Sequence, residues 1–121
     1  MNNIEDKEFT FSSLVFSIIM SANLDEVEVY KEANIDRRLF SKIRSNDFYQ
    51  PSKETAIKII FALKPGYELA KKLLACAGYH LTNNSTSDII VNYFLKNNIY
   101  DRALLDKILA HNGLKTFFSD E

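Results

Sequence analysis

The sequence predicts an all-α fold. Its apolar residues recur mostly at intervals of three and four, the spacing of one face of a helix, and no clear alternation of period two marks a strand. Only three of the 121 residues are glycine and two are proline, so positions that favour turns are few. A chain of this length builds one core, and we expect a single domain over residues 1–121.

The first part of the chain predicts two helices. The first covers about residues 10–22, and its main apolar stripe is formed by Phe11, Leu14, Val15, Ile18 and Ile19. Phe16 and Met20 add a second apolar face, which needs cover from the same chain or from a partner. The second helix begins with Asp25 and Glu26, because carboxylates are favourable at a helix N-terminus. Its inward side is expected to hold Val27, Tyr30 and Ala33.

Three more helices are predicted before residue 79. Asp36 can cap the third, at about residues 37–45, by accepting backbone N–H bonds. The inward side of this third helix is expected to consist of Leu39, Phe40 and Ile43. Ser52 caps the fourth, over residues 53–63. The fifth begins at Pro65 and ends near Gly78, a residue suited to the left-handed position that closes a helix.

Two helices are predicted in a C-terminal extension, residues 86–118. They cover about residues 87–97 and 101–111, and Asn112 and Gly113 end the second. Their buried residues are expected to be Ile89, Ile90, Tyr93, Phe94, Leu104, Leu105, Ile108 and Leu109. Phe117 and Phe118 follow without an assigned element. Two alternatives stay open: the extension covers the first helix, or Phe16, Met20 and these two phenylalanines mark the surface of a dimer or partner.

The charge of the chain is segregated along the sequence, although the net charge is only −1. Residues 1–30 hold one lysine and six acids, a local charge of −5, whereas residues 31–72 hold ten cations and five acids, a local charge of +5. Residues 73–121 carry −1, from four cations and five acids. For contact with a nucleic acid the distribution of charge matters more than its sum.

The basic segment coincides with the third predicted helix. Two short helices joined by a tight turn, the second of them cationic, form the motif that presents a helix to the major groove of DNA. The side of this helix opposite its apolar residues reads Arg37, Arg38, Ser41, Lys42 and Ser45. Arg37, Arg38 and Lys42 are the candidates for reading bases. Candidates for contacts with the DNA backbone are Lys31, Ser41, Arg44, Ser45, Lys53 and Lys58. The plainer interpretation is a solvated charged surface.

The segment VYKEANIDRRLFSKIRSN, followed after DFYQ by PSKETAIKIIFAL, resembles the lambda-repressor-like, or XRE, helix-turn-helix family. The resemblance covers roughly residues 14–63 and is carried by Val29, Ile35, Asp36, Phe40, Ile43 and the pair Pro51–Ser52. It implies a five-helix core over residues 9–79 and base-reading positions at Arg37, Arg38 and Lys42. Three positions depart from the family pattern, namely Tyr30 for a small alanine, Asn34 for the turn glycine and Arg44 for an acid.

A longer run, from ANIDRRLFSKIRSN to SDIIVNYFLKNNIYD, is similar to a helical domain found in Gram-positive bacteria both alone and appended to enzyme modules. In those fusions DNA binding is not an evident role. This second resemblance favours a different function, a module that binds or inhibits a partner protein on a helix-turn-helix scaffold.

The sequence offers no catalytic or metal-binding pattern. Cys76 is the only cysteine, so an intrachain disulfide or a cysteine zinc site is excluded. His80 and His111 are far apart in sequence, and no Gly-rich phosphate loop occurs. We therefore expect neither an enzyme nor a cofactor. The apolar run at residues 14–22 is too short to span a bilayer, and the acidic segment MNNIEDKEF is unlike a secretory signal, which favours the cytoplasm.

Taken together, the sequence favours a cytoplasmic transcription regulator of a bacterium, phage or mobile element that binds double-stranded DNA as a homodimer. A module that binds a protein partner remains the alternative. Phe48 and Tyr49, in the loop after the third helix, either stack on nucleic-acid sugars or bases or pack beneath the loop; packing is the simpler expectation.

Overall fold

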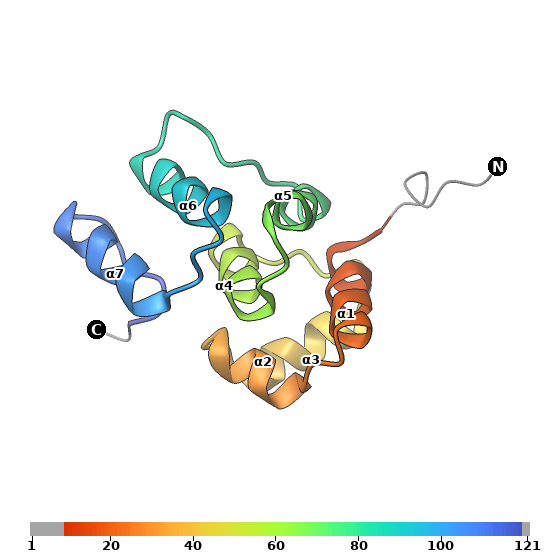
Figure 1. Ribbon diagram of the computed structural model, residues 1–121. Coiled ribbons are helices and arrows are strands. Elements are labelled where there is room, and N and C mark those ends of the chain that lie inside the picture. The colour runs from red at the N-terminus through yellow and green to blue at the C-terminus, as the bar shows by residue number, and fades with distance from the viewer. Residues whose placement is uncertain (1–8, 120–121) are drawn as a thin grey trace.

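The computed structural model describes residues 9–119, and Figure 1 shows that this part of the chain is all-helical. Within it lie α1 (Phe11–Ser21), α2 (Glu26–Glu32), α3 (Arg37–Ser45), α4 (Lys53–Leu63), α5 (Tyr67–Cys76), α6 (Thr86–Lys96) and α7 (Arg102–His111). The predicted all-α class is confirmed for these residues, and each predicted helix has a counterpart. None of these helices is long and apolar enough to cross a membrane.

The fifth helix begins two residues later than predicted. Lys64 and Gly66 both have positive φ angles, 52° and 97°, and Pro65 lies between them. These two left-handed residues turn the chain between α4 and α5, so Pro65 belongs to the connection and the helix begins at Tyr67. Gly78 closes the same helix with a φ of 88°, as predicted.

Side-chain caps fix the starts of most helices. The Ser52 hydroxyl accepts a hydrogen bond from the Thr55 amide at 3.1 Å, as predicted, and Thr10, Ser85 and Asp101 cap their helices in the same way. Asp36 was predicted to cap α3 and does not, because its side chain accepts no backbone N–H bond. Its carboxylate is exposed to solvent.

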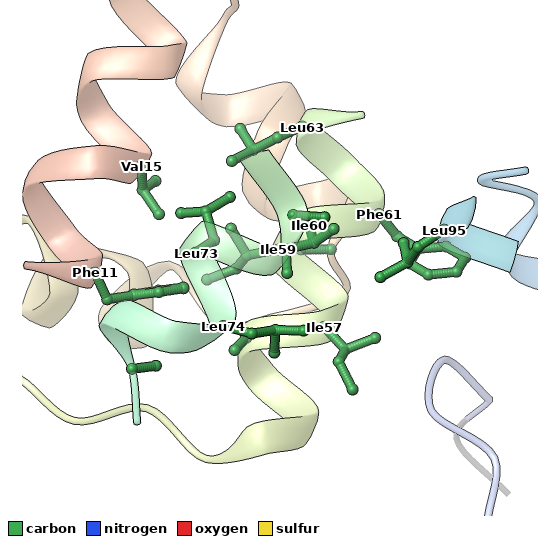
Figure 2. Close-up of a cluster of buried hydrophobic side chains, with 14 of the residues drawn as sticks. Phe11, Val15, Ile57, Ile59, Ile60, Phe61, Leu63, Leu73, Leu74 and Leu95 are labelled. Carbon is green, nitrogen blue, oxygen red and sulfur yellow. The ribbon is translucent and has the colours of Figure 1, made fainter. Parts of the chain in front are cut away.

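Helix α4 lies at the centre of the core. Figure 2 shows its side chains meeting Phe11 and Val15 of α1, Leu73 and Leu74 of α5, and Leu95 of α6. The buried residues of α4 are Ala56, Ile57, Ile59, Ile60, Phe61 and Leu63. Because α4 is buried on several sides, the helices that pack on it, above all α2 and α5, gain apolar contacts there.

The predicted inward faces of α2, α6 and α7 are wrong in part. Val27 is 43% exposed and Val29 is buried in its place. On α6, Ile89 and Tyr93 are 48% and 61% exposed, whereas Val91 and Leu95 fill the core. Leu104 on α7 is also exposed. The cause on α6 is its nearly continuous apolar run, which leaves the rotation of the helix undetermined by periodicity.

The chain returns from α7 to the core through Phe117 and Phe118. The buried carboxylate of Asp106 accepts hydrogen bonds from the amides of Phe117, at 2.8 Å, and Phe118, at 3.0 Å, and from the Ser119 hydroxyl, at 3.0 Å. The Phe118 ring lies 5.7 Å from the ring of Phe61. Both phenylalanines, unassigned from the sequence, are therefore part of the fold.

Helices α6 and α7 do not lie over α1. In Figure 1 they occupy one side of α4 and α5, and α1 occupies the other. Helix α6 packs on α5 and α7. Of the two alternatives for the extension, covering the first helix is thus excluded by the arrangement of the helices.

Replacing the buried Asp106 by alanine is predicted to lower the free energy of unfolding by about 2–4 kcal/mol, because two half-buried amides and a hydroxyl lose a charged acceptor. Urea denaturation of the full chain measures this change. Lys107→Ala, at the exposed neighbouring position, is the matched control and should stay within about 0.5 kcal/mol of the original chain. Equal stability of the two variants would show that the tail is not anchored through Asp106.

Candidate nucleic-acid interface

A short turn joins α2 to α3. Asn34 adopts a left-handed φ of 56°, which asparagine tolerates better than most residues. The Ile35 amide donates to the Tyr30 carbonyl at 3.1 Å and closes the end of α2. Asn34 therefore closes the turn without a glycine.

Helix α3 is held from behind by aromatic packing. Phe40 and Ile43 are buried, and the ring of Phe40 lies 5.3 Å from Phe16 of α1 and 5.5 Å from Tyr30 of α2. The Ser12 hydroxyl donates a hydrogen bond to the Ile43 carbonyl. The bulky Tyr30 is accommodated because its ring packs against Phe40 at the junction of the two helices.

The opposite face of α3 is open to solvent. Its exposed residues are Arg37, Arg38, Ser41, Lys42 and Ser45, and we call them the α3 cationic face. None of the ion pairs found among residues 9–119 involves Arg37, Arg38 or Lys42. The Ser45 hydroxyl donates to the Ser41 carbonyl at 3.0 Å within the helix. The three predicted base-reading side chains thus lie together, and within the described residues no carboxylate neutralises them.

The cations predicted for the DNA backbone are placed less uniformly. Lys31 is exposed on α2, and Lys58 is half-buried on α4. Arg44 pairs with Glu26 of α2, and its guanidinium lies 5.4 Å from the centre of the Phe16 ring. Lys53 lies 2.7 Å from the Asp88 carboxylate of α6, which is only 9% exposed. Arg44 and Lys53 therefore have internal partners that link helices.

Carboxylates lie at the start of α2, where they were expected only to stabilise the helix N-terminus. Asp25 and Glu28 are exposed, and Glu26 is the partner of Arg44. In helix-turn-helix docking the first helix of the motif crosses the phosphate backbone, where carboxylates are repelled. The sequence signal was that these acids belong to the helix that directly precedes the cationic one, and the pair of Glu26 with Arg44 shows that one of them lies against α3.

The loop after α3 presents one aromatic ring to solvent and buries the other. Phe48 is 85% exposed, and Tyr49 packs against the core. The Phe48 amide donates to the Asn46 side-chain oxygen at 3.0 Å, a local turn that fixes the backbone at the ring. Packing beneath the loop was therefore the right expectation for Tyr49 and the wrong one for Phe48.

The remaining reactive groups do not converge on the α3 cationic face. Burial raises the pKa of the Cys76 thiol, and the nearby Lys72 ammonium opposes that rise only in part. His80 and His111 are exposed. Within residues 9–119, no group of three or more His, Cys, Asp or Glu residues is placed to hold a metal ion.

A comparison of the chain with protein-family models, with curated proteins and with solved structures found no match. The assignment of this interface consequently depends on the geometry and charge of α2, α3 and the loop that follows.

Arg44→Ala is predicted to lower the free energy of unfolding by about 1 kcal/mol, since it removes both the Glu26 pair and the contact with the Phe16 ring. Arg37→Ala and Arg38→Ala should each change it by less than about 0.5 kcal/mol, because neither side chain is paired within the described residues. Urea titrations of the three variants measure the difference. A loss at Arg37 or Arg38 as large as that at Arg44 would contradict the assignment of an open face.

Proposed function

We propose that the protein is a sequence-specific DNA-binding regulator of transcription in the cytoplasm, and that α3 enters the major groove. The observation that carries the proposal is the α3 cationic face, an exposed row of Arg37, Arg38 and Lys42 on a helix fixed from behind by buried Phe40 and Ile43. The order of α1 to α5, with a tight turn between α2 and α3, supports the lambda-repressor-like arrangement.

The proposed contacts follow from the place of each side chain. Arg37 and Arg38 are in the first turn of α3, the end of a recognition helix that meets base edges, and Lys42 follows one turn later. Arginine donates two hydrogen bonds to guanine O6 and N7. Ser41 and Lys31 are exposed donors for phosphate oxygens, and Ser45 joins them once its hydroxyl turns away from the Ser41 carbonyl. Arg44 and Lys53 contribute to the shape of the protein through their internal pairs.

The acids of α2 limit how this surface approaches DNA. Asp25 and Glu28 have to stay clear of the phosphates, so the duplex is met by α3 with few contacts from the start of α2. We therefore expect a smaller dependence of affinity on salt than for a uniformly basic domain of the same size.

Arg37→Ala or Arg38→Ala is predicted to weaken binding to a preferred duplex by about 1–3 kcal/mol, because each removes a base contact. The duplex is first selected from a randomised library, and fluorescence anisotropy then gives the affinity. Lys96→Ala, an exposed cation on distant α6, is the control of equal charge change. Affinity lost equally with Lys96→Ala, or retained in both arginine variants, would refute the base-reading role.

One observation favours a second candidate, a module that binds a protein partner. The α3 cationic face is on the same helix as Arg44, which pairs with the Glu26 carboxylate of α2, and the exposed ring of Phe48 follows α3 in the chain. A surface with both signs of charge and an apolar anchor is typical of protein interfaces. If the purified chain has no measurable affinity for any duplex at low salt, this second function replaces the first.

A further inference from the structure

A groove runs between α1 and the C-terminal end of α3. It has a volume of about 240 Å³, and among its lining residues are Phe16, Met20, Glu26, Arg44 and Asp47. Phe16 and Met20 are four residues apart and lie on one side of α1. Met20 is 81% exposed, although it is a large apolar side chain. Such a side chain is unfavourable in water, so its exposure at the edge of a groove indicates an unfilled contact.

An exposed aromatic ring lies at the end of the same groove. Asp47 lines both the groove and a neighbouring hollow that Phe48 also lines. Phe48 is 85% exposed, and the bond from its amide to Asn46 fixes the backbone that presents the ring. One face of the protein thus carries both a projecting aromatic side chain and an apolar-floored groove.

We propose that a second copy of this chain occupies the groove, and that Phe48 of each copy inserts beside Phe16 and Met20 of the other. A two-fold dimer uses the same patch on both copies, so that patch must be complementary to itself. A face that carries both a projecting ring and a hollow for it meets this requirement. A groove of this volume holds roughly eight water molecules, the space of about one large side chain. Aromatic and methionine side chains are also the types enriched at interface cores.

The charges at the rim fit the same occupant. Arg44 keeps a side chain that is 54% exposed despite its pair with Glu26, and Asp47 is exposed nearby. A two-fold axis through the groove allows Arg44 of one copy to approach Asp47 of the second copy. Because the rim of the groove carries one exposed cation and one exposed acid, a second copy matches both charges, whereas a uniformly acidic or basic partner would match only one.

Other apolar surfaces fit a dimer less well. Phe117 and Phe118 are held by Asp106 and the core, so neither is free for a partner. Ile89 and Tyr93 are exposed on α6, on the opposite side of α4 from α1 (Figure 1). A contact at the α1–α3 groove lies next to the C-terminal end of α3.

Sedimentation equilibrium of the full chain without DNA tests the proposal separately from DNA binding. The expected result is a species of twice the chain mass, with a dissociation constant raised at least about tenfold by Phe48→Ser or Met20→Ser. Both positions are exposed, so folding is preserved, and circular dichroism verifies it. Tyr93→Ser, at an exposed position of α6, is the matched control and should leave the dissociation constant of the dimer unchanged.

A cross-link locates the contact directly. In a Cys76→Ala background, one sample carries Met20→Cys and another carries Phe48→Cys, and the two are mixed and oxidised. A disulfide between the two different chains is expected, formed faster than in a mixture of Met20→Cys with Tyr93→Cys. A monomer up to millimolar concentration, or a dimer weakened by Tyr93→Ser and not by Phe48→Ser, would overturn the proposal whatever the outcome with DNA.

Discussion

Burial of Phe40 and Ile43 is the constraint on which the candidate surface depends. These two side chains fix the rotation of α3 against α1 and α2, and the hydrogen bond from Ser12 to the Ile43 carbonyl holds the helix at its C-terminal half. Because the apolar side of a short helix is committed to the core, the other side has to face water. The packing behind the helix therefore exposes Arg37, Arg38 and Lys42, whose side chains form no hydrogen bond or ion pair with the rest of the described chain.

The same packing separates two kinds of cation. Arg44 and Lys53 are held by carboxylates of neighbouring helices, so their charges help to fix how α2 meets α3 and how α4 meets α6. Arg37 and Arg38 have no such partner within residues 9–119 and keep their full capacity for an external ligand. A count of basic residues in the sequence cannot make this distinction, because it depends on which helices become neighbours.

The helices were predictable because caps and periodicity are local. Ser52 and Gly78 mark their helix ends from sequence, and the turn at Asn34 needs only a residue that tolerates a left-handed backbone. The rotation of α6 was not predictable, since its apolar residues occupy more than one side and its contacts with neighbouring helices decide that Val91, not Ile89, is buried. Placement of the three candidate base-reading residues on one open face followed from the amphipathic pattern. The partners of Arg44 and the exposure of Phe48 are tertiary facts with no local signature.

Contact between the α3 cationic face and a DNA duplex is the proposal on which the function depends. A titration of the isotopically labelled chain with a short mixed-sequence duplex at low salt, followed by amide NMR, tests it residue by residue. The largest chemical-shift changes are expected at the amides of residues 36–45, and the amides of α6 are expected to remain unchanged. Changes confined to α6 and α7, or no change at a duplex excess, would contradict it.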